Sequence, residues 1–383
     1  MKNNIFKFEK EIKNFETQLT KLNKNIRDKL REEFYNDLLL LVARKTKEVK
    51  NKVRLDKIDS RKNSISADKL LKNDIIKKLP SWVREELDNS IIIGNSKKVI
   101  QTPDKRKYHL DNKLNNLSGG EWTFFLNSII STRYPTSGIE SYAHEIRKIH
   151  PSPKPPQLMK EIIEFFTKEN DLVFDYFMGV GGTLLGASLC KRRAIGIDLS
   201  SKYIDAYKKA AKLIGLPEQK TYQADSVGFL KNNSKYSKLL NDEVIDLILI
   251  DPPYGDMMAR EKTGESAKNN KSKGTPFTNL NEDLGNMNWE IFRQVFEETT
   301  RNAITKLKIK GHLIIFIKDL QPKNGSINLL HADLIQDINS ISEINYIGTK
   351  IWADLSVNLY PYGYPHSYVS NQIHQYILIF RKG

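Results

Sequence analysis

The sequence predicts an α/β protein in which helices cover both faces of a mostly parallel sheet, with a basic helical region preceding it. From Glu121 onward, apolar strand-like runs alternate with amphipathic helical patterns, as in open parallel sheets. The first 120 residues instead carry a repeat of helical spacing and most of the excess positive charge. The chain has 383 residues, of which 39% are hydrophobic, so it can form one large core and a smaller appended unit.

Residues 1–120 are predicted to form a helical, basic region. Apolar side chains recur there at alternating spacings of four and three, which is typical of a helical hairpin or a short coiled coil. These side chains are Phe8, Ile12, Phe15, Leu19, Leu22 and Ile26. The repeat fits packing within its own domain, and it also fits a homodimer through the N-terminal helix. Residues 1–120 hold 29 Lys and Arg against 17 Asp and Glu, so we expect this region to contact nucleic-acid phosphates or to mediate oligomerisation.

The composition excludes several classes of protein. One cysteine cannot form a disulfide framework, and seven scattered histidines show no zinc-ligand spacing, so no metal site is expected. The longest aliphatic run, residues 38–43, is far shorter than the roughly 20 residues of a membrane-spanning helix, and the amino terminus has no signal-peptide core. The sequence therefore predicts a soluble, cytoplasmic protein without membrane contact.

A glycine-rich turn between a strand and a helix predicts a cofactor site in residues 121–383. A strand over 172–174 leads into this turn, and a helix follows over 184–190. Because glycine has no Cβ, its backbone can approach a ligand closely, although a tightly packed turn would show the same pattern. A second strand ends at Asp198, whose carboxylate can accept hydrogen bonds from ribose hydroxyls, and Asp225 after a third strand can accept one from an adenine amine. The candidate cofactor residues are Asp175, Phe177, Gly179, Gly181, Gly182, Thr183, Asp198 and Asp225.

The run Asp251-Pro252-Pro253-Tyr254 is predicted to be the catalytic centre. An apolar strand over 244–250 delivers it to a strand's carboxyl end, where open α/β sheets bind ligands. The exocyclic amine of a base is a poor nucleophile because its lone pair is delocalised into the ring. If the Asp251 carboxylate and the Pro252 carbonyl accept the amine hydrogens, the nitrogen can present its lone pair to a methyl group. Pro253 adds a fixed φ without a competing N–H donor, and Tyr254 offers a flat face to a base rotated out of its stack.

Asp251 to Tyr254 resembles the signature tetrapeptide of the amino-group (N6-adenine / N4-cytosine) DNA methyltransferases, and residues 177–181 resemble their cofactor loop. Residues 150–158 resemble the Lys-Pro element that in this family closes over the methionine end of the cofactor, which adds Lys154 and Pro155 to the candidate cofactor residues. The resemblance covers roughly residues 140–383. It implies a Rossmann-like methyltransferase fold, with a mostly parallel seven-stranded sheet and an antiparallel terminal hairpin over 346–353 and 375–382. It also implies S-adenosyl-L-methionine as methyl donor and DNA as partner.

The resemblance leaves the acceptor open between several bases. The Asp form of the tetrapeptide is usual for adenine N6, whereas cytosine N4 enzymes more often carry Ser in the first position, so adenine is favoured. Gly181-Gly182 together with the tetrapeptide and Gly255 also resemble transfer-RNA guanine-N2 methyltransferases, which keeps RNA as an alternative partner. The RNA-binding domain of those enzymes is a mixed α/β module, whereas residues 1–120 here look helical. An inactive methyltransferase-fold subunit that binds nucleic acid is the non-enzyme alternative.

Two further segments have open interpretations. The stretch 255–285 follows the tetrapeptide and is predicted either to contact nucleic acid as a flap, through Lys262, Lys268, Lys271 and Lys273, or to be a passive solvated loop. An aromatic cluster near the last hairpin can line a base pocket or pack against the sheet edge. Its members are Tyr360, Tyr362, Tyr364, His366 and Tyr368.

Overall fold

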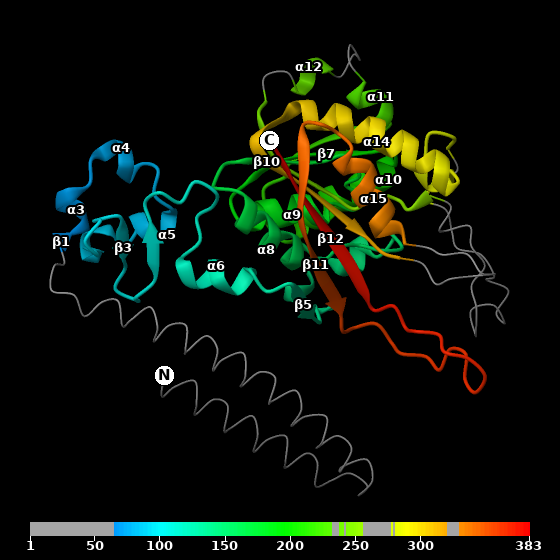
Figure 1. The fold of residues 1–383 in the computed structure, drawn as a ribbon, viewed down its shortest axis with the longest axis horizontal. Coiled ribbons are helices and arrows are strands. Elements are labelled where there is room, and N and C mark those ends of the chain that lie inside the picture. The colour runs from blue at the N-terminus through cyan, green and yellow to red at the C-terminus, as the bar shows by residue number, and fades with distance from the viewer. Residues whose placement is uncertain (1–64, 232–236, 241–242, 256–276, 279, 320–328) are drawn as a thin grey trace, which may run out of the picture. The chain divides into compact units, whose positions relative to one another are not determined.

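The computed structural model describes residues 65–231, 237–240, 243–255, 277–278, 280–319 and 329–383. The chain divides into two compact units, of which the first comprises Met1–Lys72 and Glu86–His109 and the second comprises Asn73–Glu85 and Leu110–Gly383 (Figure 1). The apolar repeat predicted within residues 8–26 and the four lysines of the predicted flap lie outside the described residues.

The described part of the first unit contains a four-stranded antiparallel sheet in the order β1-β2-β3-β4. Its elements are β1 (Ile65–Ser66), α3 (Ala67–Leu70), η1 (Leu87–Asn89), β2 (Ile91–Ile93), β3 (Val99–Gln101) and β4 (Lys107–His109). Ile92 and Ile100 pair across β2 and β3 and are almost fully buried. The helical prediction for residues 1–120 is wrong at these strands, because strands of two or three residues are too short to show an alternating pattern.

The second unit is built on a sheet that has eight strands within the described residues, in the order β5-β11-β12-β10-β9-β6-β7-β8. The strands are β5 (Ile129–Thr132), β6 (Leu172–Asp175), β7 (Arg193–Asp198), β8 (Lys220–Gln223), β9 (Ile245–Ile250), β10 (Leu307–Ile317), β11 (Ile344–Asp354) and β12 (His374–Lys382). Strands β8, β7, β6, β9 and β10 are mutually parallel, and β12 runs antiparallel to both β10 and β11. This arrangement confirms the predicted α/β class and the antiparallel terminal hairpin.

The sheet has one strand more than the seven predicted. The additional strand is β5, which pairs in parallel with β11 at the sheet edge, with Ile129 opposite Ile351. The four residues of β5 are partly exposed and show no alternation of buried and exposed positions, so no sequence pattern distinguished them from a loop.

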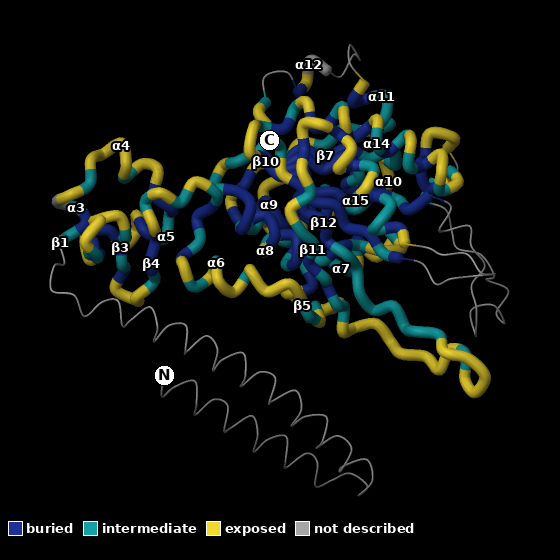
Figure 2. Tube along the Cα trace, viewed as in Figure 1, coloured by how far each residue is buried: buried dark blue, intermediate teal, exposed yellow. Residues whose placement is uncertain are grey.

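Helices cover both faces of the sheet, as predicted. The helices in the described residues of this unit are α4 (Asn73–Ile76), α5 (Ser81–Arg84), α6 (Gly119–Phe125), η2 (Ile139–Ser141), α7 (His144–Arg147), α8 (Pro156–Phe166), α9 (Gly182–Leu189), α10 (Ser201–Leu213), α11 (Ser226–Leu230), α12 (Ser237–Leu240), η4 (Leu284–Asn286), α14 (Trp289–Lys306) and α15 (Leu330–Asn339). Successive residues of the central strands face opposite layers. Phe174 and Ile248 pack in the layer of α11, α14 and α15, whereas Val173 and Leu247 pack in the layer of α8, α9 and α10. Figure 2 shows that these strands are the most buried part of the unit. None of the described helices is long and apolar enough to cross a membrane.

The parallel strands place acidic residues at one edge of the sheet. Asp175 ends β6, Asp198 ends β7, and Asp251 follows the last residue of β9. Because β7, β6 and β9 are neighbours that run in the same direction, their carboxyl ends lie side by side. The fold thus gathers at one edge three of the four carboxylates that the sequence predicts as site residues, namely Asp175, Asp198 and Asp251.

Candidate active site

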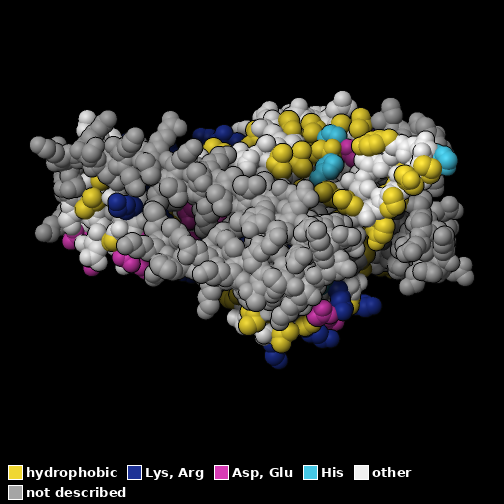
Figure 3. Space-filling view, turned by 90° about the horizontal axis from the view of Figure 1, so that it is seen from below, with side chains coloured by type: hydrophobic (Ala, Val, Ile, Leu, Met, Phe, Trp, Pro, Cys, Tyr) yellow, Lys and Arg dark blue, Asp and Glu magenta, His cyan; other side chains and the backbone are white. Residues whose placement is uncertain are grey.

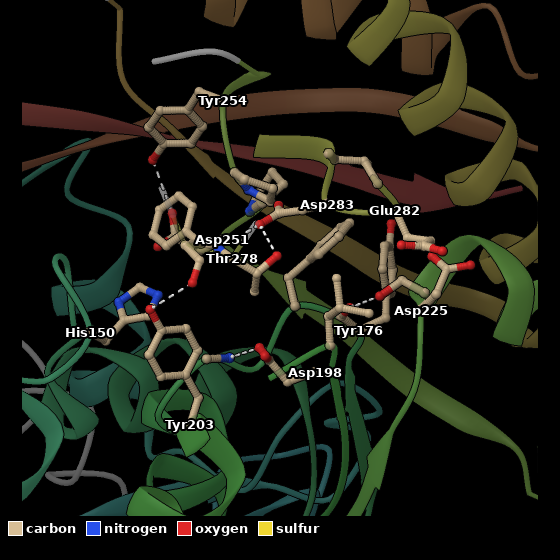
Figure 4. Close-up of a pocket in the computed structure, with 18 of the residues that line it drawn as sticks. His150, Tyr176, Asp198, Tyr203, Asp225, Asp251, Tyr254, Thr278, Glu282 and Asp283 are labelled. Carbon is tan, nitrogen blue, oxygen red and sulfur yellow. Dashed lines mark hydrogen bonds between the residues drawn. The ribbon is translucent and has the colours of Figure 1, made fainter. Parts of the chain in front are cut away.

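A cleft of about 770 Å³, counted with its open mouth, lies at the carboxyl edge of the parallel strands (Figure 4). Its lining includes predicted cofactor residues and predicted catalytic residues. The former are Phe177, Gly179, Asp198 and Asp225, and the latter are Asp251, Pro252, Pro253 and Tyr254. A smaller adjoining cleft of about 330 Å³ shares Phe177, Gly179 and Asp251 with the first. It is also lined by Lys154, Asp175, Gly182 and Thr183. The predicted cofactor turn and the predicted catalytic turn therefore face shared space.

The catalytic turn contains a carboxylate whose two oxygens both have partners. Asp251 Oδ2 lies 2.5 Å from Lys154 Nζ. Asp251 Oδ1 accepts a hydrogen bond from the Tyr254 hydroxyl at 3.0 Å (Figure 4). The Tyr254 side chain is only 7% exposed, and its burial together with the Asp251 charge raises the pKa of its phenol well above the ordinary value. Tyr254 thus donates to Asp251 in this structure, and little of its ring is open to a stacked base.

The glycine turn is shaped by positions that exclude a side chain. Gly179 and Gly181 have φ of +49° and +73°, a region that favours glycine. A Cβ on Gly181 would lie 2.2 Å from the Tyr207 ring, and a Cβ on Gly182 would lie 2.7 Å from the Lys154 carbonyl oxygen. The turn therefore packs tightly on one side, and Gly179 lines the cleft on the other. Tight packing of the turn is observed, and the cofactor site there stays a prediction.

Two buried acidic residues flank the glycine turn. Asp175 accepts the N–H of Phe177 at 3.0 Å, and Asp198 accepts the N–H groups of Gly179 and Ser200, each at 2.8 Å. Burial raises the pKa of Asp175 to about 7 and that of Asp198 to about 6. Such shifts are typical of functional sites, because carboxylates are seldom buried without a strong partner.

The other predicted cofactor residues have structural roles in this state. Asp225 caps α11, because its carboxylate accepts the N–H groups of Val227 at 3.0 Å and Gly228 at 2.7 Å. Asp225 also lines the large cleft. Pro155 precedes the first turn of α8 as its N-cap residue.

Several cleft residues were not predicted from the sequence as site residues. His150 stacks on Phe277 with ring centroids 5.2 Å apart and meets the Tyr203 ring edge-on at 4.9 Å. Burial lowers the pKa of His150 to about 4, so the imidazole is neutral near pH 7, and its Nδ1 accepts the N–H of Ser152. His150 is the first residue of the segment that resembles the Lys-Pro element, so its position in the sequence could have marked it as a site residue. Phe277 and Tyr203 lie in unremarkable sequence and become recognisable only when the fold brings them together.

The aromatic cluster near the last hairpin does not line the cleft. Residues 355–373 connect β11 to β12, and Tyr364 and Tyr368 on this loop are 82% and 91% exposed. In Figure 1 this loop extends toward the right-hand side of the picture. In Figure 3, which is turned about the horizontal axis, hydrophobic and histidine side chains gather on the same right-hand side. None of these tyrosines is among the residues that line the two clefts, and Tyr364 and Tyr368 are too exposed to be packed against the sheet edge. Among the residues that the structure describes, no group of three or more His, Cys, Asp or Glu is placed to hold a metal ion.

Comparison with known proteins gives a family match and partial relatives. The model of a family described as DNA methylase, of the N6 and N4 type, matches residues 2–209, which is more than half of the chain. A tRNA (guanine(10)-N2)-dimethyltransferase from Methanocaldococcus jannaschii is 30% identical over 220 residues, covering 55% of this chain and 57% of that protein. The Type II methyltransferase M2.LlaDCHI from Lactococcus lactis subsp. cremoris is 42% identical over 60 residues, covering 16% of this chain and 22% of that protein.

The matched regions leave large parts of these relatives uncovered, since the chain spans little more than half the length of the first and less than a quarter of the second. Among solved structures, the crystal structure of TrmN from Thermus thermophilus is similar to this chain with a TM-score of 0.40 and 14% identity, covering 64% of this chain and 53% of that one.

Proposed function

This chain belongs to the family of N6- and N4-type DNA methylases, and from that premise we propose that it methylates an exocyclic amine of a nucleic-acid base, namely N6 of adenine in DNA. Its fold is the Rossmann-like fold of S-adenosylmethionine-dependent methyltransferases, with an additional strand β5. S-Adenosyl-L-methionine is its methyl donor.

The residues of the two clefts fit this donor. The missing side chain of Gly179 makes room for the His150 ring, since a Cβ there would lie 3.3 Å from His150 Nε2, and both residues line the larger cleft. Asp198 keeps lone pairs free on both oxygens besides the two N–H groups that it accepts, so it can receive ribose hydroxyls. Once bound, the donor supplies a methyl group on a positively charged sulfur. Asp175 and Asp251 border the smaller cleft. The Asp251 carboxylate complements such a charge, and Asp175, whose pKa burial raises to about 7, complements it only in its ionised form.

The catalytic turn supplies hydrogen-bond acceptors for the amine. The Asp251 carboxylate and the Pro252 carbonyl each receive one amine hydrogen, which lets the nitrogen pyramidalise and present its lone pair. With the donor bound, the nitrogen would form the new N–C bond as the sulfur–carbon bond breaks, and Asp251 or water would take the surplus proton from the nitrogen. Because Tyr254 occupies Asp251 Oδ1 in this structure, an incoming amine must displace that hydroxyl or share the oxygen with it.

The observation that carries this proposal is that Asp251 and Asp198, from different strands, line one cleft. The experiment is to incubate the protein with isotope-labelled S-adenosylmethionine and duplex DNA or tRNA, and to identify the methylated nucleoside by mass spectrometry. N6-methyladenine from DNA is the expected product. N4-methylcytosine would correct the base and keep the reaction. Absence of any methylated base, with donor bound, would favour a nucleic-acid-binding subunit without activity.

Methylation of guanine N2 in tRNA is the second candidate function. The relative that supports it is the tRNA dimethyltransferase, whose match of 220 residues is longer than that of M2.LlaDCHI. The helical pattern that the sequence predicts for residues 1–120 is an objection to it, because the RNA-binding domain of such enzymes is mixed α/β. Strands β1 to β4 in residues 65–109 weaken that objection. N2-methylguanine from tRNA, with duplex DNA inert, would decide for this candidate.

We propose that the basic amino-terminal region supplies phosphate contacts, but with a boundary different from residue 120. Residues 73–85 and 110–120 belong to the second unit. Ser81 Oγ donates to Glu169 at 2.5 Å, and the Asn115 side chain donates to the Phe165 carbonyl at 2.7 Å. These contacts tie the two segments to the methyltransferase fold, so they are poor candidates for a separate nucleic-acid module.

A further inference from the structure

A buried ion pair joins the Lys-Pro segment to the catalytic turn. The Lys154 ammonium lies 2.5 Å from Asp251 Oδ2, and the two side chains are 6% and 18% exposed. The Phe316 ring lies near the ammonium, with its centroid 5.5 Å from Nζ. A buried ammonium is unfavourable unless it is paired, so the Asp251 carboxylate compensates for the burial of Lys154.

The backbone of Lys154 is held as firmly as its side chain. The Lys154 carbonyl oxygen accepts a hydrogen bond from Arg147 Nη1 at 2.9 Å, and Arg147 Nε donates to the Tyr142 carbonyl at 3.1 Å. Arg147 is 1% exposed. Gly182 packs so closely on the same Lys154 carbonyl that no side chain fits between them. Lys154 is therefore fixed in place before any ligand binds.

Two donors fix the orientation of the Asp251 carboxylate. Lys154 holds Oδ2, and the Tyr254 hydroxyl holds Oδ1. A carboxylate with a donor on each oxygen resists rotation about its Cβ–Cγ bond. The contact from Lys154 crosses the fold from another segment, whereas Tyr254 moves with the catalytic turn itself. Lys154 therefore sets where the carboxylate lies relative to the cofactor cleft.

We propose that Lys154 is a positioning residue that holds the Asp251 carboxylate in place for the incoming amine, and that it does not serve as a contact of the methyl donor. This inference rests on the proposed methyl transfer. It departs from the role that the family resemblance implied for the Lys-Pro element. A free ammonium beside the smaller cleft would repel a positively charged sulfur, so the ion pair has to persist when the donor binds.

The first test separates catalysis from donor binding. Lys154→Met keeps the length of the side chain without its charge, Lys154→Arg keeps the charge, and Lys350→Met is a matched control. Lys350 is also a buried lysine, 6% exposed, but its Nζ donates to the Phe125 and Asn127 carbonyls. We expect Lys154→Met to lower kcat at saturating donor about 100-fold, as small misplacements of reacting groups do, with the dissociation constant of S-adenosylhomocysteine nearly unchanged. Lys154→Arg should recover part of the loss, and Lys350→Met should leave kcat at the wild-type value.

The second test measures the charge of the pair by calorimetry and needs no turnover. In Asp251→Asn the Lys154 ammonium loses its counter-charge, so S-adenosylmethionine, which is positively charged at sulfur, should bind more weakly. S-Adenosylhomocysteine lacks that charge and should be affected less. Adding Lys154→Met to Asp251→Asn should remove this difference between the two ligands.

The inference is overturned if Lys154→Met raises the dissociation constants of both ligands as much as it lowers kcat/KM, since Lys154 would then bind the donor. It is equally overturned if Lys154→Met keeps wild-type kcat. These outcomes differ from failure of the proposed function, in which the wild-type protein itself methylates no base. In that case the calorimetric comparison still decides whether Lys154 and Asp251 act as a pair.

Discussion

Asp198 accepts the backbone N–H of Gly179 at 2.8 Å, so the carboxylate that ends β7 fixes the turn that follows β6. The same carboxylate lines the large cleft. One residue therefore fixes the glycine turn and also lines the cleft. Any change in the charge of Asp198 is expected to affect donor binding through both contacts.

The first prediction concerns the pH dependence of donor binding. Burial raises the pKa of Asp198 from 3.8 to about 6, so the carboxylate is ionised at pH 8 and becomes protonated as the pH falls through about 6. A protonated carboxyl group accepts ribose hydroxyls less well. We expect the affinity for S-adenosylhomocysteine to fall about tenfold between pH 8 and pH 5, the range for a lost hydrogen bond to a charged group. Calorimetry across this range measures the change.

The control for this prediction is Asp175, whose pKa is raised by burial to about 7. Asp198→Asn should bind S-adenosylhomocysteine weakly and lose most of the pH dependence of binding, whereas Asp175→Asn should retain that pH dependence.

The folding stability of the ligand-free protein should instead decrease as the pH rises. Both folded-state pKa values lie above the ordinary value of 3.8, so their contribution to folding is fully present at low pH and is lost as the pH rises through about 6 to 7. If the pH dependence of S-adenosylhomocysteine binding is unchanged in Asp198→Asn, a group other than Asp198 causes it.

The second prediction is that Gly181 cannot carry a side chain. Gly181→Ala combines a φ of +73° with a Cβ 2.2 Å from Tyr207, whereas Gly215→Ala combines a φ of +68° with open space. Gly215→Ala should therefore cost only backbone strain, about 1 kcal/mol of unfolding free energy. Gly181→Ala should cost more than about 3 kcal/mol, because the Tyr207 ring or the turn must also move. Urea denaturation of both variants checks the difference, and equal losses would contradict the packing argument.

Much of the fold and of the site was predictable because its signals are local in the sequence. A strand, a glycine turn and a helix occur together around Gly179, and Asp198 and Asp251 each follow an apolar strand. Parallel strands then bring their carboxyl ends to one edge without further information. Asp198 and Asp251 could thus be assigned to one site, although they lie far apart in the chain.

The parts that were not predicted depend on contacts between distant segments. Lys154 and Asp251 are 97 positions apart, and nothing near either residue identifies the other as its partner. The stacking of His150 on Phe277 has the same origin. Strand β5 was missed because it acquires its identity only by pairing with β11. Sequence periodicity reports which face of an element is buried, but not which charged or aromatic side chain lies opposite.

The third prediction concerns an aromatic residue that the sequence did not mark. The Phe277 ring lines the cleft and stacks on His150, and its carbonyl accepts the Tyr203 hydroxyl at 3.4 Å. Because the Phe277 ring borders the space beside Asp198, we expect Phe277→Ala to weaken S-adenosylhomocysteine binding about three- to tenfold, the range for one aromatic contact. Phe124→Ala is the control, since Phe124 is 56% exposed on α6. Wild-type affinity in the Phe277 variant, measured by calorimetry, would remove Phe277 from the donor site.

The last prediction assigns the phosphate contacts to residues 1–64. This segment contains 18 Lys and Arg against 10 Asp and Glu, so it carries most of the chain's net charge of +15. Deleting residues 1–120 would also remove Ser81 and Asn115, whose contacts support the second unit, and would confound binding with folding. Deleting residues 1–64 leaves Ser81 and Asn115 in place, so a change in binding can be separated from a change in folding. Each lost phosphate contact should reduce the slope of log affinity against log salt concentration by about 0.9 on duplex DNA, because fewer counterions are released.

The measurement is DNA binding by fluorescence anisotropy at several salt concentrations, with calorimetry of S-adenosylhomocysteine as the folding control. The shortened chain should bind S-adenosylhomocysteine like the full chain and should show weaker DNA binding with a flatter salt dependence. An unchanged salt slope would place the phosphate contacts on residues 65–383 instead. Charge-neutralising substitutions of Lys262, Lys268, Lys271 and Lys273 would then be the next variants to measure, since these lysines follow the catalytic turn in the sequence.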